Sequence, residues 1–197
     1  MAAKMLKSTK NIMIVGVGGQ GTLLTSRILG RLILRKGYDV KLSEVHGMAQ
    51  RGGSVVTFVR YGDRVEEPIV EAGQADLLIA FECLEGMRYA HFLRSTGKLV
   101  INEQRIDPMP VIIGYVEYPK DIIGKLKEAN YIVYSIDAES EAKELGNSKV
   151  SNMIVLGRAA RYLDFKFSDW MEVIEETVPK KTIEVNKKAF CIGYQNQ

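Results

Sequence analysis

The sequence has few of the residues that bind metals or form disulfides. Its 197 residues include two cysteines, Cys83 and Cys191, and two histidines, His46 and His91. Two cysteines far apart in the chain do not make a disulfide framework, and an iron–sulfur cluster usually takes four thiolates. The histidines lack the spacing of a zinc site. We therefore expect that this chain alone holds no metal ion and no cluster.

Long apolar runs and an excess of one charge are also missing. No apolar run approaches the ~18 residues of a membrane span, and the polar, basic residues 1–10 do not resemble a signal peptide. The 27 basic and 24 acidic residues are too balanced to indicate nucleic-acid binding. The length suits one domain. We expect a single cytoplasmic domain over residues 1–197, with neither a membrane nor nucleic acid as partner.

What is present is a glycine-rich stretch, residues 16–21, between an apolar run at 12–15 and a helical pattern at 20–36. Its glycines have the G-x-G-x-x-G spacing of dinucleotide sites, where the backbone turns sharply and approaches a ligand. The helix start would offer free N–H groups and a positive dipole end to an anion. The alternative is a strand-to-helix turn that merely needs glycine. The candidate cofactor contacts here are Gly16, Gly18, Gly19, Gln20 and Gly21.

A second glycine-rich stretch follows the alternating residues 38–45, which we predict to be a strand. An ordinary dinucleotide fold would continue into a helix, but residues 46–53 have no apolar stripe and read as a loop. The β-branched run 54–61 then predicts an extra strand. His46 suits proton transfer and Arg51 suits clamping an anion, although neither is a certain catalytic residue. The other candidate contacts are Gly47, Gln50, Gly52, Gly53 and Ser54; the alternative is a polar surface loop.

The rest of the chain alternates between strands and helices. We predict strands at 76–81, 98–102 and 131–136, an extended segment at 111–115, and helices at 82–94, 119–128, 138–145, 147–163, 168–178 (capped by Ser168) and 180–193. The predicted class is α/β: a Rossmann-like, mainly parallel sheet with helices on both faces, an extra strand pair after the second strand, and a helical C-terminal section.

Ligands of such sheets bind outside the carboxyl ends of the strands. Four loops meet that criterion: residues 16–21, 44–53, 82–86 and 102–105. Glu44 stands near where an acidic ribose ligand would be expected, but the missing helix favours a solvated carboxylate at a strand end. His91 is expected to be a hydrogen-bonded histidine in the core or at its edge. The G-x-S-x-G elbow and the phosphate-binding G-x-x-x-x-G-K-[ST] loop are absent, so the site does not look like a complete catalyst.

The two glycine-rich stretches together resemble one family. Residues 16–21, GVGGQG, joined to residues 43–55, SEVHGMAQRGGSV, are similar to the gamma-type subunit, or domain, of 2-oxoacid:ferredoxin oxidoreductases. Within that family the similarity points to the small (beta) subunit of the indolepyruvate-type enzyme. It covers nearly the whole chain and includes Asn102, the helix start at 137–139, Asn152 and residues 186–194.

The resemblance implies a subunit of a thiamine diphosphate enzyme that decarboxylates a 2-oxoacid oxidatively to an acyl-CoA. Thiamine diphosphate and the iron–sulfur clusters would lie in a large partner subunit, which passes electrons to ferredoxin. This chain would be inactive alone, and in the assembled hetero-oligomer it would complete the substrate and CoA pocket. Residues 18–21 and 46–54 would face that pocket, with Gln50 and Arg51 as candidates for contact with an anion.

The substrate and some alternatives remain open at this point. Aryl pyruvates are the first expectation, by resemblance, and pyruvate, 2-oxoglutarate and branched-chain 2-oxoacids are the others. A self-sufficient dehydrogenase that binds a nicotinamide or flavin is disfavoured by the missing helix after the second strand. A stand-alone dinucleotide- or CoA-binding module is the remaining alternative. Cofactor binding by the isolated chain would distinguish these alternatives from an enzyme subunit.

Overall fold

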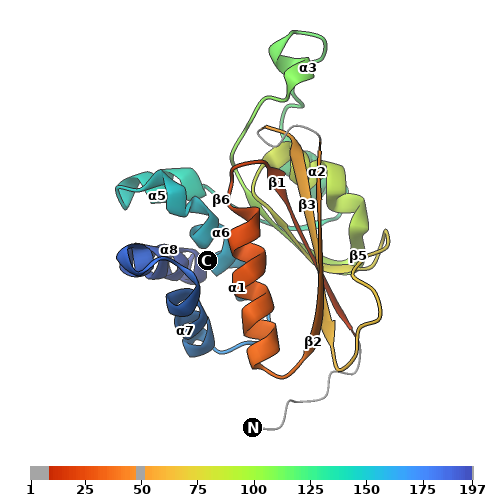
Figure 1. The fold of residues 1–197 in the computed structure, drawn as a ribbon. Helices are drawn as coiled ribbons and strands as arrows, with labels where there is room; N and C mark the ends of the chain where they lie inside the picture. Colours follow the sequence, from red (N-terminus) through yellow and green to blue (C-terminus); the bar gives the residue numbers. More distant parts are fainter. Residues whose placement is uncertain (1–8, 48–51, 197) are drawn as a thin grey trace.

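Six strands form one mixed sheet in the computed structural model, which describes residues 9–47 and 52–196. Figure 1 shows the sheet with helices on both sides. Strands β1, β4, β5 and β6 run parallel, while β3 pairs antiparallel with both β1 and β2. The order across the sheet is β2 (Asp39–His46), β3 (Ser54–Gly62), β1 (Lys10–Val17), β4 (Ala75–Ala80), β5 (Leu93–Asn102) and β6 (Ile132–Ile136). The predicted Rossmann-like, mainly parallel sheet is confirmed.

The extra strand pair is also confirmed. Strands β2 and β3 pair antiparallel in a hairpin, with His46 opposite Val55, in place of a crossover helix. Strand β3 then lies beside β1, with Ser54 opposite Val17. This register sets the start of β3 at the edge where β1, β2, β4 and β5 end.

The helices form two layers. One face of the sheet is covered by α1, α5, α6, α7 and α8, and the other by α2 and α4 (Figure 1). Strand β1 serves both layers because side chains alternate along a strand: Ile12 and Ile14 join the first core, Met13 and Val15 the second. The helices are α1 (Thr22–Arg35), α2 (Cys83–Tyr89), α3 (Met109–Ile112), α4 (Ile122–Glu128), α5 (Ala138–Glu144), α6 (Ser151–Ala160), α7 (Phe167–Thr177) and α8 (Ile183–Gln195), with 3₁₀ turns η1 (Ala90–Phe92), η2 (Ser148–Val150) and η3 (Lys180–Thr182).

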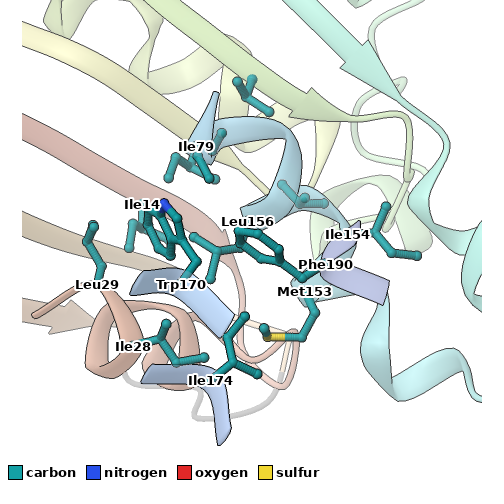
Figure 2. Packing of buried hydrophobic residues seen from close by; sticks show 14 of the residues in the cluster. Ile14, Ile28, Leu29, Ile79, Met153, Ile154, Leu156, Trp170, Ile174 and Phe190 are labelled. Carbon is teal, nitrogen blue, oxygen red and sulfur yellow. The ribbon is translucent and has the colours of Figure 1, made fainter. Parts of the chain in front are cut away.

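The larger core is built around α6 and the C-terminal helices. Figure 2 shows Trp170 of α7 and Phe190 of α8 packed with Leu156 of α6. All three side chains are fully buried, and each such burial stabilises the fold by about 1.5–3 kcal/mol. The C-terminal helical section is therefore an integral part of the core that supports β1 and α1. No helix within 9–47 and 52–196 has both the length and the apolar character needed to cross a membrane.

Three local predictions are wrong, and a fourth, for His91, is right only in its hydrogen bond. Residues 111–115 are not extended, because α3 begins after Pro108, and Pro110 in its first turn needs no hydrogen-bonded N–H. Ser168 does not cap α7: the helix starts one residue earlier, and the carboxylate of Asp169 accepts from the N–H of Lys166 at 3.2 Å.

The helix predicted for 82–94 ends at Tyr89, and β5 starts at Leu93. His91 is exposed rather than in the core, although its Nδ1 lies 2.9 Å from the carbonyl oxygen of Arg88.

Candidate functional site

Backbone hydrogen bonds join the two glycine-rich loops at the carboxyl edge of the sheet. The N–H of Gly18 donates to the carbonyl oxygen of Gly53 at 2.9 Å, and the N–H of Gly47 donates to that of Ser54 at 3.2 Å. These bonds continue the β1–β3 and β2–β3 pairing beyond the strands. The described ends of the second loop are therefore joined to the first loop in one rim.

The side chain of Gln20 connects this rim to the third and fourth loops. Its Nε2 donates to the carbonyl oxygen of Phe81 at 2.9 Å and to Oε1 of Gln104 at 2.5 Å, and its Oε1 accepts from the N–H of Val17 at 2.6 Å. Gly16 leaves room for this arrangement, because a Cβ there would stand 2.8 Å from Oε1 of Gln20. The structure thus brings all four predicted loops together, with Gln20 as a brace beneath the first one.

An open pocket of about 310 Å³ lies between the first glycine-rich loop and the β2–β3 hairpin. Its wall combines backbone from the glycine turn, the first residues of α1 and side chains from the β2–β3 hairpin. The lining residues are Gly18, Gly19, Gly21, Thr22, Leu23, Glu44, His46 and Val55. The pocket therefore offers a helix start on one side and a polar pair on the other.

The helix start in this wall suits an anion. Helix α1 begins after Gly21, which has a left-handed conformation with φ +83°, and no side chain caps the first turn. The first turn also contains no acidic residue. Backbone N–H groups at such a helix start attract phosphate or carboxylate groups, because they are unpaired and lie at the positive end of the helix dipole.

The left-handed turn rests on a buried side chain of α6. Asn152 is 4% exposed and lies against Gly21, where an added Cβ would collide with its amide nitrogen. That nitrogen also reaches the carbonyl oxygen of Gly21 at 3.5 Å. Both the backbone angle and the neighbour therefore require glycine at this position.

The polar wall consists of Glu44 and His46 on the same face of β2. Nε2 of His46 lies 2.6 Å from Oε1 of Glu44, and the hydroxyl of Thr57 donates to Oε2 of the same carboxylate at 3.0 Å. The Glu44 side chain is only 16% exposed, whereas that of His46 is 51% exposed. Glu44 is thus not the solvated carboxylate that the sequence suggested. It orients the imidazole at the mouth of the pocket, where the ring can donate a hydrogen bond to a ligand or accept one from it.

Other predicted site residues are not among those that line this pocket. Gly52 is exposed, and the Ser54 hydroxyl donates to Oε2 of the buried Glu85 at 2.5 Å, so it is held by α2. Gln50 and Arg51 lie outside the described residues. Thr22, Leu23 and Val55 also line the pocket and were not predicted from the sequence. A usable signal was present, since the residues directly after the last glycine of such a loop form the first turn of the helix.

Within residues 9–47 and 52–196, neither an activated thiol nor a metal site accompanies the pocket. Burial, and next the charge of Glu82, raise the pKa of the Cys83 thiol to about 11, so it keeps its proton near neutral pH. No group of three histidine, cysteine or acidic side chains that could hold a metal ion occurs within the part of the chain that the structure describes. The polar features of this pocket wall are the start of α1 and the Glu44–His46 pair.

The fold and the site define a Rossmann-like α/β domain whose sheet carries an antiparallel hairpin and whose first glycine loop leads into a helix start without a side-chain cap. The family model of pyruvate ferredoxin/flavodoxin oxidoreductase matches residues 11–196. Indolepyruvate oxidoreductase subunit IorB of Thermococcus kodakarensis is 40% identical over 188 residues, which cover 93% of each chain. The chain belongs to the pyruvate ferredoxin/flavodoxin oxidoreductase family.

Solved structures share this fold. Pyruvate oxidoreductase subunit PORC from Thermotoga maritima has a TM-score of 0.72 at 22% identity, over 96% of this chain and 97% of its own. The 2-oxoglutarate:ferredoxin oxidoreductase of Magnetococcus marinus, solved with 2-oxoglutarate, coenzyme A and succinyl-CoA bound, has a TM-score of 0.73 at 20% identity. That match covers 96% of this chain but 31% of the longer one. The architecture thus occurs both as a separate chain and as part of a longer one.

Proposed function

We propose that this chain is the small, cluster-free subunit of an indolepyruvate-type 2-oxoacid:ferredoxin oxidoreductase. The whole chain would act as one gamma-type domain that completes the substrate and CoA pocket of a thiamine diphosphate enzyme. The observation that carries this proposal is the hydrogen-bonded rim made by the described parts of the two glycine-rich loops beside an open pocket. An open half-site at a sheet edge suits a subunit whose partner supplies the reactive cofactor.

The residues present fit part of this chemistry. The start of α1 would hold one phosphate of CoA or the carboxylate of the substrate, and His46 would face the same ligand from the opposite wall. They do not make a thiamine diphosphate site, because its diphosphate is normally held through Mg²⁺ and a set of acidic ligands for that ion is missing from the described parts of the chain. The cofactor supplies the carbanion chemistry when it is bound to the large partner subunit. This chain would position the substrate and shield it from water.

Indolepyruvate is the preferred substrate because the relative from Thermococcus kodakarensis carries that name and is similar over nearly the full length of both chains. Pyruvate, 2-oxoglutarate and branched-chain 2-oxoacids are the alternatives within the same class. The pocket accommodates a carboxylate in each case, so the choice among them depends on the side of the pocket that the partner contributes.

Reconstitution tests the proposal. The chain and the large subunit of the same organism would be purified separately under anoxic conditions, with thiamine diphosphate and clusters in the large subunit. We expect CoA-dependent reduction of a viologen dye by indolepyruvate only when both are mixed, with slower turnover of the other 2-oxoacids. Activity of the isolated chain would contradict the proposal. So would tight binding of NAD or a flavin by the isolated chain, which would favour a self-sufficient dehydrogenase.

A further inference from the structure

An arm with an apolar tip projects from the edge of the sheet that carries the pocket. It comprises residues 103–118, leaves β5 at its carboxyl end and contains α3, which stands beyond the body of the molecule at the top of Figure 1. Residues 108–116, PMPVIIGYV, carry no charge. Five of their side chains are largely exposed: Met109 (65%), Ile112 (65%), Ile113 (69%), Tyr115 (82%) and Val116 (49%).

The tip is held in shape by its own backbone. The N–H groups of Tyr115 and Val116 donate to the carbonyl oxygen of Pro110 at 2.8 and 3.2 Å, and that of Ile113 donates to the carbonyl oxygen of Met109 at 3.0 Å. These bonds fix the turn while its apolar side chains face solvent. A preorganised apolar surface is suited to binding, because little conformational entropy is lost when a partner covers it.

Both ends of the arm are anchored to one buried carboxylate. Glu82, which is 1% exposed and caps α2, accepts from the hydroxyl of Tyr118 at 2.5 Å and from the N–H of Ile106 at 3.2 Å. The guanidinium of Arg105 stacks over the Tyr118 ring, 4.5 Å from its centre. Glu82 is therefore a positioning residue that fixes the direction in which the arm projects.

The base of the arm is also tied to the pocket. Oε1 of Gln104 accepts from Gln20 beneath the first glycine loop, and the carbonyl oxygen of Gln104 accepts from the N–H of Cys83 at 3.0 Å. The tip and the pocket are thus parts of one hydrogen-bonded framework at one edge. A partner that covers the pocket would approach the same edge from which the arm projects.

From these contacts the geometry points to the apolar tip as the docking element for the large, thiamine-containing subunit, an inference that rests on the function proposed above. From their exposed fractions, the five side chains expose roughly 600 Å², most of the ~800 Å² that each partner buries in an interface of standard size. The complementary surface is an apolar groove, since an uncharged tip would leave buried charges there unpaired. Docking at the tip would set the second half of the pocket against the glycine rim.

Binding measurements with the complete chain and the complete large subunit test this inference. The variant Ile112→Ser/Ile113→Ser makes the tip polar, and Tyr115→Ser does so at a second position. The matched control is Leu34→Ser/Ile69→Ser, which alters two exposed apolar residues away from the tip. Thermal unfolding of each isolated chain shows that the fold is retained. We expect the tip variants to bind about 100-fold more weakly, as for buried hot spots of an interface, and the control within about threefold of wild type.

Two results would overturn the docking role. One is wild-type affinity of both tip variants for the large subunit while the reconstituted enzyme is active, which leaves the proposed function intact. The other is sedimentation of the isolated chain as a dimer that the tip variants convert to a monomer without loss of large-subunit binding, because the occupant is then a second copy. Failure of the wild-type chain to bind the large subunit would contradict the proposed function itself.

Discussion

The N–H of Gly18 donates to the carbonyl oxygen of Gly53 at 2.9 Å, and this bond makes one rim out of two loops that are far apart in the chain. It is a backbone bond, so it depends on the β1–β3 register and not on side chains at either position. The register itself is set by the cores on both faces, because a slip of one residue would turn each buried side chain of β3 to the wrong face. On the side of β2 and β3 the pocket wall is therefore positioned by the pairing of the sheet.

The first prediction concerns Gly21 at the start of α1. Gly21→Ala combines an unfavourable backbone angle with a collision against Asn152, so we expect a loss of about 2–4 kcal/mol in the free energy of unfolding. Gly19→Ala is the control, since Gly19 also has a positive φ, +104°, but faces open space. Its loss should be only about 1–2 kcal/mol. Urea denaturation measures both values, and equal losses would contradict the role of Asn152.

A double-mutant cycle separates the two causes at Gly21. In an Asn152→Ala background the collision disappears and only backbone strain remains, so the cost of Gly21→Ala should fall by about 1 kcal/mol. The measurement is again the free energy of unfolding in urea. Strictly additive losses would show that the amide of Asn152 yields to the new methyl group without cost.

The second prediction concerns Arg51, which directly precedes Gly52 in the second loop. Arg51→Ala in the reconstituted enzyme should lower kcat/KM about tenfold or more, since a hydrogen bond to a charged group contributes about 1.5–3 kcal/mol. Arg64→Ala is the control, because its side chain is 83% exposed and pairs with Glu66. Kinetics of Arg51→Ala equal to those of the control would count against an anion contact in this loop.

The third prediction concerns the buried thiol of Cys83 and alkaline pH. Its pKa is raised from 9.0 to about 11, first by burial and then by Glu82. Above pH 9 the thiol of the unfolded chain loses its proton while that of the folded chain keeps it. The contribution of this thiol to stability is therefore fully present below pH 9 and is lost as the pH rises toward 11. Between pH 8 and 11 the unfolding free energy of wild type should fall by about 2 kcal/mol relative to that of Cys83→Ala. A difference that is independent of pH would contradict the raised pKa.

The fourth prediction concerns the anchor of the arm. Tyr118→Phe removes the hydroxyl that donates to Glu82 and accepts from the N–H of Leu84 at 3.1 Å. We expect a loss of about 1–3 kcal/mol in unfolding free energy, together with faster amide exchange in residues 106–118. Tyr115→Phe, at the exposed tip, should change neither value. Unchanged exchange in Tyr118→Phe would mean that other contacts suffice to hold the arm.

The local architecture was predictable because its signals lie within a few residues of one another. Apolar alternation, glycine stops and the β-branched run 54–61 indicated the strands, the hairpin and most helices. The errors arose where two local signals pointed to different structures and the one that was not followed determined the fold. Prolines at 108 and 110 start a helical turn as readily as they mark a loop, and Asp169 caps α7 by reaching back to Lys166 in place of Ser168.

The site was only half predictable. The two glycine-rich stretches were recognisable as a pair, and three of the predicted contacts, Gly18, Gly19 and Gly21, line one pocket with the catalytic candidate His46. Whether each of them contacts a cofactor stays a prediction. Glu44 was misread because its partner Thr57 stands on another strand, and that pairing exists only through the β2–β3 register.

By itself the sequence determined which segments become strands, helices and glycine turns, because hydrophobic periodicity and backbone permissiveness are properties of short stretches. The tertiary structure alone decided which segments meet: Gln20 with Gln104, Ser54 with Glu85, and Asn152 beneath Gly21. These pairs are brought together by strand register and by packing of α6 on the sheet. No local pattern encodes them, because each partner's neighbours in sequence are unrelated to its neighbours in space.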